Sequence, residues 1–114
     1  MSLTTSDRHN LQLLLQSLKQ QGWLPVEVLF QGFWEHTPSI EAVQAQIEDC
    51  EPPVVRVMKG NFEQGFKSGI LRLRFAAGTE GLIDDHTLSD SFPEAVELAR
   101  KDLASPSSLQ GAAA

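Results

Sequence analysis

Residues 54–75 read VVRVMKGNFEQGFKSGILRLRF, and this stretch decides the fold class. Both ends are rich in β-branched or aliphatic residues, which favour strands. The connection between them contains three glycines in residues 60–69, which suits a turn with positive φ angles. The sequence therefore predicts two antiparallel neighbouring strands joined by a hairpin connection, 54–58 and 70–75.

Apolar and charged residues alternate along the second of these strands. Leu71, Leu73 and Phe75 are expected to face the core, because successive side chains of a strand point to opposite sides. Arg72 and Arg74 then project from the other face. If the first strand pairs in a suitable register, Arg56 joins these two arginines on the outer face.

Basic and aromatic side chains gather around the predicted hairpin. Arginine and aromatic residues are enriched in interface hot spots, since a planar guanidinium pairs with carboxylates and stacks on rings. An alternative is a solvated face whose arginines pair with local carboxylates. The sequence predicts a partner-binding surface made of Arg56, Lys59, Phe62, Phe66, Arg72 and Arg74, with Lys67 nearby.

Three amphipathic helices are expected outside this stretch. Leucines at positions 11, 14, 15 and 18 predict a helix over 6–21, with a capping box from Thr4 to Asp7 and a stop at Gly22. Thr37 followed by proline predicts the start of a helix over 38–50. Ser91 and Glu94 form a second capping box before a helix over 92–104.

A further strand is predicted to begin after Pro25. Residues 27–32, EVLFQG, resemble the cleavage sequence read by enterovirus 3C proteases, and flanking apolar residues such as Trp23 and Trp34 favour a native strand there. Gly32 marks the end of this strand or a bulge. Leu82 and Ile83 predict a short edge strand, after a turn at 78–81.

The resulting order is α-β-α-β-β-(β)-α, which predicts an α+β two-layer sandwich with a small, mostly antiparallel sheet packed by three helices. If the strands flanking the second helix were parallel, their crossover would be right-handed. Residues 1–104 are expected to form a single domain, and the small, polar segment 105–114 a flexible tail. Helices on one side would leave the other sheet face partly open.

Composition narrows the classes of function. The 114 residues carry a net charge of −6, which disfavours general nucleic-acid binding. A single cysteine excludes an intramolecular disulfide and fits a cytoplasmic location. Neither a secretory signal nor an apolar run of membrane-spanning length is recognised, so no membrane association is expected. The sequence leaves undecided whether the chain forms a homodimer. A chain of this size buries only about two thirds of its unfolded surface, which leaves room for stabilisation by self-association.

No sequence motif predicts a cofactor, metal or catalytic site. The histidines lack the spacing of a metal-binding helix. Asp84, Asp85 and His86 form the densest polar cluster, but they are interpreted as turn residues leading into the last helix. Cys50, flanked by acidic residues that disfavour a thiolate, is interpreted as a core residue.

The favoured hypothesis is a non-catalytic protein-interaction module, such as an adaptor, chaperone-like or inhibitor protein. It would bind a protein partner, acidic in character, through the open sheet face or the hairpin. One alternative is a small enzyme or ligand-binding protein with a site assembled from distant residues such as His36 and His86. The other is localised nucleic-acid binding through Arg56, Arg72 and Arg74.

Overall fold

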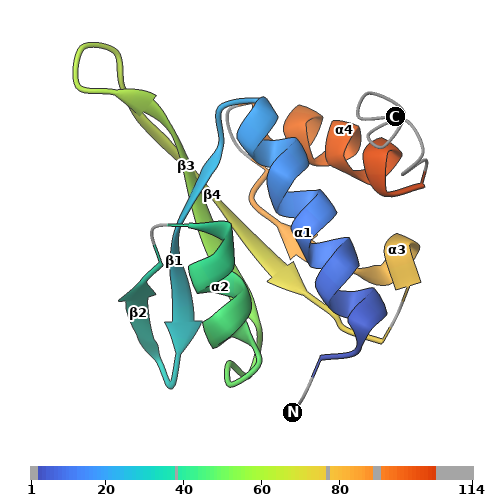
Figure 1. Cartoon of the computed structure of the whole chain (residues 1–114). Coiled ribbons are helices and arrows are strands. Elements are labelled where there is room, and N and C mark those ends of the chain that lie inside the picture. The colour runs from blue at the N-terminus through green and yellow to red at the C-terminus, as the bar shows by residue number, and fades with distance from the viewer. Residues whose placement is uncertain (1–2, 38, 77, 89–90, 105–114) are drawn as a thin grey trace.

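The computed structural model describes residues 3–37, 39–76, 78–88 and 91–104, and shows an α+β fold (Figure 1). The predicted tail, 105–114, lies outside the described residues. In chain order the elements are α1 (Thr5–Gln20), β1 (Leu24–Phe30), β2 (Phe33–His36), α2 (Ile40–Ile47), β3 (Val54–Asn61), β4 (Gly65–Leu73), α3 (Gly78–Gly81), β5 (Ile83–His86) and α4 (Phe92–Ala104).

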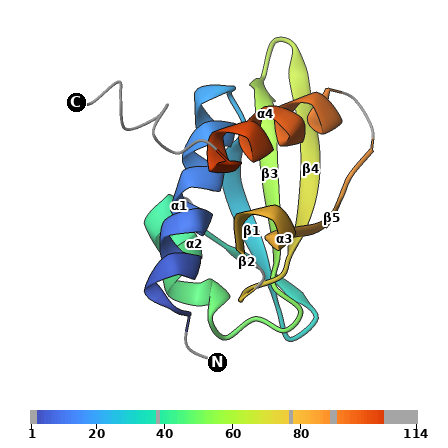
Figure 2. The same ribbon diagram turned by 90° about the vertical axis from the view of Figure 1, so that its right-hand side faces the viewer.

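The five strands form one antiparallel sheet in the order β2-β1-β3-β4-β5. Helices α1, α2 and α4 lie on one side of it (Figure 2), which confirms the predicted two-layer arrangement. The predicted strand faces are also confirmed, because Leu71 and Leu73 are buried whereas Arg72 and Arg74 are exposed. On the next strands Val55, Val57 and Val28 continue the covered face. Among the described residues, no helix lies on the opposite face (Figure 2).

Helix α1 begins and ends as the sequence indicates. The Thr4 hydroxyl accepts a hydrogen bond from the Asp7 amide at 3.0 Å, which satisfies one of the unpaired amides of the first turn. The capping box is incomplete, however, because the Asp7 carboxylate accepts from the amide of Ala76 after β4 instead. At the other end the Trp23 amide bonds back to the carbonyl of Leu18, a Schellman arrangement that closes the helix.

The segment after Trp23 contains two strands where the sequence predicts one. Strand β1 starts at Leu24, before Pro25, and turns back into β2 through Gln31 and Gly32, whose φ angles are 50° and 85°. Two successive positive φ angles make the tight turn that matches strand twist. Because β2 lies at the sheet edge, β1 and β3 become antiparallel neighbours, so the parallel crossover considered above does not occur.

Helix α2 is shorter than the predicted span of 38–50. Its N-cap is Ser39, whose hydroxyl accepts from the Ala42 amide at 3.1 Å, and not Thr37. Thr37 instead donates its amide to the Val26 carbonyl at 2.8 Å, which holds it in the sheet layer. The helix therefore begins after the proline, and it ends at Ile47 before the two prolines can break it.

The C-terminal half agrees more closely with prediction. Helix α4 spans the predicted residues, and the Ala95 amide bonds to the Ser91 carbonyl at 3.3 Å. The edge strand exists as β5 but starts at Ile83 and runs to His86, so the cluster interpreted as a turn is largely strand. One register shift separates its pairs with β4, leaving Asp84 as the extra, bulged residue.

The core joins all the larger elements into one cluster, centred between the helices and the sheet. Trp23 and Phe92 meet edge to face with ring centroids 4.9 Å apart. Phe92 lies directly over Gly69 of β4, where an added Cβ would come within 2.6 Å of the ring. The largest fully buried side chains are Trp23, Phe92, Leu11, Leu14, Leu15, Leu18, Ile47, Leu71, Leu82, Leu103, Val28 and Val43.

Candidate functional site

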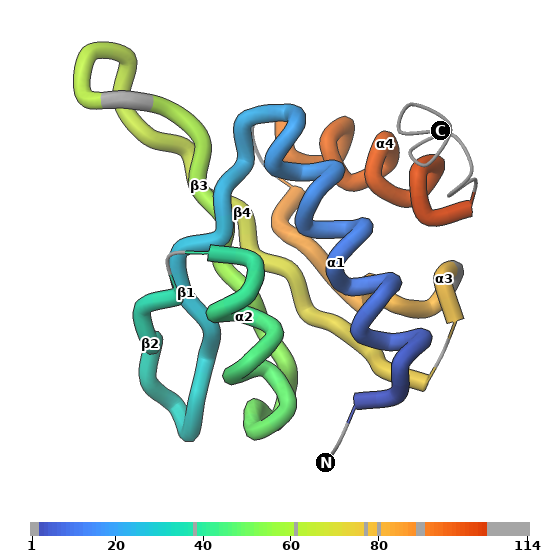
Figure 3. The backbone as a smooth tube through the Cα atoms, in the orientation of Figure 1, coloured from blue at the N-terminus to red at the C-terminus, as the bar shows by residue number. Residues whose placement is uncertain are grey.

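The β3–β4 hairpin projects well beyond the helices and the rest of the sheet (Figure 3). Its last pair is Asn61 with Gly65, so three residues form the loop. Phe62 in that loop is 96% exposed and Phe66 is 51% exposed. Their rings contact each other edge to face with centroids 5.4 Å apart. We call this pair the aromatic tip; water surrounds a large apolar area that a core would normally bury.

Phe66 belongs to the open face of the sheet. Its partner in the ladder is Gly60, where a Cβ would come within 2.1 Å of the Gly65 carbonyl oxygen, so that only glycine fits. Further along the same face, Met58 pairs with Leu24, which is 48% exposed. Apolar side chains thus continue from the aromatic tip onto the open face: Leu24, Leu29, Trp34, Met58 and Ile70.

Arg56 lies in the middle of this open face, as predicted. Its Nη1 donates to Glu27 Oε1 at 2.8 Å, and the two residues are direct cross-strand partners. Its guanidinium also stacks over the Trp34 ring, 4.2 Å from the centroid. Both contacts fix the side chain, and the Glu27 carboxylate compensates its charge locally.

Arg72 and Arg74 also have a shared acidic partner. The bulge in β5 directs Asp84 towards them, so that Arg74 Nη2 lies 2.6 Å from one carboxylate oxygen and Arg72 Nε 3.6 Å from the other. This is the locally paired arrangement raised as an alternative above. Both arginines remain more than half exposed. Partner or nucleic-acid binding by them stays a prediction.

Two lysines lie on the other side of the hairpin. Lys59 and Lys67 are directly opposite each other in the ladder and both are exposed. Like charges in this position repel. Within the described part of the chain neither lysine forms an ion pair. The hairpin therefore carries aromatic groups on one side and, on the other, two lysines that make no ion pair within the described residues.

The histidines do not converge on a catalytic arrangement. His36 lies on β2 and His86 on β5, at opposite edges of the sheet. The His86 ring has Nδ1 2.9 Å from the Thr87 carbonyl oxygen and its edge towards Phe92. Asp85 accepts from the His86 amide rather than from the ring. Among the residues that the structure describes, no three metal-ligating side chains gather.

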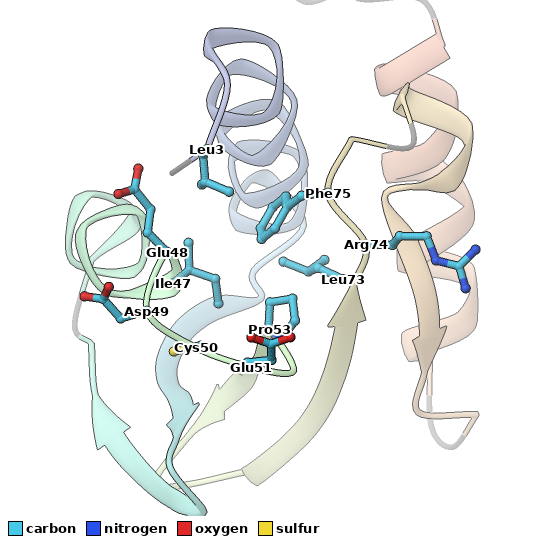
Figure 4. Close-up of a pocket in the computed structure, with 10 residues that line it drawn as sticks. All are labelled: Leu3, Ile47, Glu48, Asp49, Cys50, Glu51, Pro53, Leu73, Arg74 and Phe75. Atoms are coloured by element: carbon cyan, nitrogen blue, oxygen red, sulfur yellow. The ribbon is translucent and has the colours of Figure 1, made fainter. Parts of the chain in front are cut away.

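A cavity of about 370 Å³ lies at the opposite end of β3 and β4 from the aromatic tip. Figure 4 shows apolar side chains around a central space, whereas Arg74 points away towards β5. Those apolar side chains are Leu3, Ile47, Pro53, Leu73 and Phe75. We call this space the apolar cavity after these five side chains, while polar atoms make up about half of its accessible lining. No sequence pattern indicates this cavity, because its lining comes from three separated segments.

The cavity rim is acidic. Asp49 and Glu51 are exposed beside it, and Glu48 bonds to Arg8 of α1. Cys50 lies between them but is 93% covered, as predicted, and its Sγ donates to the Gln46 carbonyl at 3.4 Å. Burial, and secondly the nearby Asp49 carboxylate, raise the pKa of the Cys50 thiol. The thiol is therefore a poor nucleophile.

Comparison with known proteins adds no family. No protein-family model, curated protein or solved structure matches the chain. Within the described ranges, no helix is both long enough and apolar enough to cross a bilayer.

Proposed function

We propose that this protein is a non-catalytic protein-interaction module that binds a protein partner through the β3–β4 hairpin and the adjoining open face. The observation that carries the proposal is the aromatic tip, with Phe62 96% exposed on a projecting hairpin. An exposed aromatic side chain contributes nothing to the core, yet it can supply much of the affinity of an interface.

The surroundings of the tip support the same function. Aromatic, methionine and arginine side chains are enriched in interfaces, and the open face has Met58, Trp34 and Arg56 in one continuous surface with Phe66. The Trp34 and Glu27 contacts hold Arg56 in place before binding, which lowers the entropy lost when a partner docks.

The test removes the aromatic tip without disturbing the core. Phe62→Ser/Phe66→Ser should bind the partner about 30-fold more weakly than wild type, the effect of losing a hot spot worth about 2 kcal/mol. Leu88→Ser is the matched control, because Leu88 is 80% exposed but lies outside the hairpin. Binding is measured by titration of the partner recovered with the wild-type chain, and circular dichroism checks the fold of each variant. Full retention of the partner by the double variant would rule out the tip.

A charge reversal tests the arginine part of the surface separately. Arg72→Glu/Arg74→Glu places two further carboxylates beside Asp84, so association with an acidic partner should slow. The defect should shrink at high salt, which screens exposed charges. Association rates at two salt concentrations provide the measurement. An unchanged rate in low salt means that these arginines belong only to the solvated surface.

A further inference from the structure

The structure places two complementary surfaces at opposite ends of the same strands. One end has the aromatic tip with the two lysines behind it, and the other has the apolar cavity with its acidic rim. Seven residue steps separate Val54 from Asn61, about 23 Å of strand. A rigid ribbon of this length prevents the tip from reaching the cavity of its own chain.

We propose that copies of this chain associate head to tail, with the aromatic tip of one copy inserted into the apolar cavity of the next. This rests on the proposed function, because it names the partner of the same hairpin. An apolar space of about 150 Å³ is enough for a benzene ring. The cavity, at about 370 Å³, therefore has room for at least one ring of the tip.

Charge complementarity selects this occupant. Lys59 and Lys67 face each other without a carboxylate partner in the described structure, and Asp49 and Glu51 at the rim likewise make no ion pair there. Docking places Lys59 and Lys67 of one copy close to Asp49 and Glu51 of the next. On a chain with net charge −6, the exposed lysine pair is a place where a second copy meets attraction instead of repulsion.

The geometry determines the kind of assembly. Each contact uses two different surfaces, so a pair of copies still has one free cavity on one copy and one free tip on the other. Association therefore continues to longer chains or closes into a ring. It differs from a two-fold dimer through the open face, in which one surface would meet itself and association would stop at two.

The test separates the two ends with variants of the full chain. Phe62→Ser/Phe66→Ser removes the tip, and Asp49→Lys/Glu51→Lys reverses the rim, with all four residues exposed in the fold. Sedimentation equilibrium should show wild type growing in mass with concentration, more weakly in high salt. Each variant alone should stay monomeric. An equal mixture should form a dimer and stop, since only one productive contact remains.

Two results would overturn the inference. Wild type that stays monomeric up to about 1 mM has no such contact at useful strength. If the mass of wild type grows with concentration but the mixture of the two variants forms no dimer, the contact lies on another surface. Circular dichroism verifies that both variants fold, and Lys59→Glu/Lys67→Glu replaces the tip variant if it does not. The partner titration with Phe62→Ser/Phe66→Ser remains independent: a foreign partner lost by that variant supports the proposed function even when wild type is monomeric.

Discussion

The two halves of the β3–β4 ribbon share one ladder but have opposite surroundings. In the lower half Val55 and Val57 pair with Leu71 and Gly69 beneath the helices. In the upper half Lys59 pairs with Lys67 and Gly60 with Phe66, and this part of the ribbon projects beyond the described helices (Figure 1). Backbone pairing is therefore common to both, and burial distinguishes them. The lower half contributes stability, whereas the upper half presents a surface.

The largest expected difference between the halves is their response to truncation. Leu71→Ala should lower the free energy of unfolding by about 2–5 kcal/mol, because it leaves a cavity among packed side chains. Phe62→Ala removes a larger side chain but should change stability by only about 0.5 kcal/mol, since water already surrounds it. Urea denaturation of both variants provides the comparison. Similar losses would show that the tip is packed in solution.

A smaller effect should follow from filling the space at Gly69. Gly69→Ala places a methyl group within 2.6 Å of the Phe92 ring, and such overpacking costs about 1–3 kcal/mol. In a Phe92→Leu background the same change should cost less, because the ring that it strikes is gone. A double-mutant cycle measured by urea denaturation gives the coupling. An equal loss of unfolding free energy in both backgrounds would show that the contact with the Phe92 ring is not the cause.

Sequence periodicity predicts most of the lower half. The alternation in 70–73 assigns the faces of Leu71, Arg72 and Leu73 correctly, but β4 runs from Gly65 to Leu73, so that Phe75 lies beyond the strand and is only partly buried. Outside the ribbon, the stripe of leucines places α1 to within one residue. Strand β2 is missed because its four residues alternate poorly: Phe33 is exposed and Trp34 is only half-buried. Its existence depends on the turn at Gln31 and Gly32, where glutamine is an uncommon residue for a positive φ angle.

Helix α2, which packs against β1, depends on its N-cap. Ser39→Ala should cost about 0.5–2 kcal/mol, because it leaves the Ala42 amide without its acceptor. Thr37→Val should be neutral or stabilising, since the Thr37 hydroxyl is buried and has no hydrogen-bond partner in the described structure. Thermal unfolding of the two variants distinguishes them. A reversed ranking would restore Thr37 as the cap.

The smallest effect is the pH dependence that comes from Cys50. Its folded-state pKa is raised by burial and by Asp49, so the unfolded chain loses the thiol proton first as the pH increases. The contribution to stability is complete below the ordinary thiol pKa and is lost as the pH rises through the folded-state value. Between about pH 7 and pH 10 wild type should therefore lose more stability than Cys50→Ala. Parallel curves from urea denaturation would contradict this.

The exposure of the candidate site residues is predictable from sequence, but their ion pairs are not. The exposed positions of Phe62, Phe66 and the arginines follow from alternation and the glycine-rich turn. Their ion pairs depend on Asp84 and Glu27, which belong to other strands. The bulge that directs Asp84 is a property of the β4–β5 register and leaves no local signal in the sequence.

The contact between α1 and α4 forms late in protein synthesis, because the two helices lie near opposite ends of the sequence. Ser17 bonds to Asp102 at 2.6 Å, and Gln21 bonds to the Ala95 carbonyl, so the first helix is completed by the last. The 85 residues that separate Ser17 from Asp102 take a ribosome roughly 4 to 17 s to add. During that interval the leucines of α1 lack their final cover. In the nascent chain, the segment at risk of misassembly is therefore the set of α1 leucines that the folded protein buries. The exposed Phe62 and Phe66 are not the segment at risk.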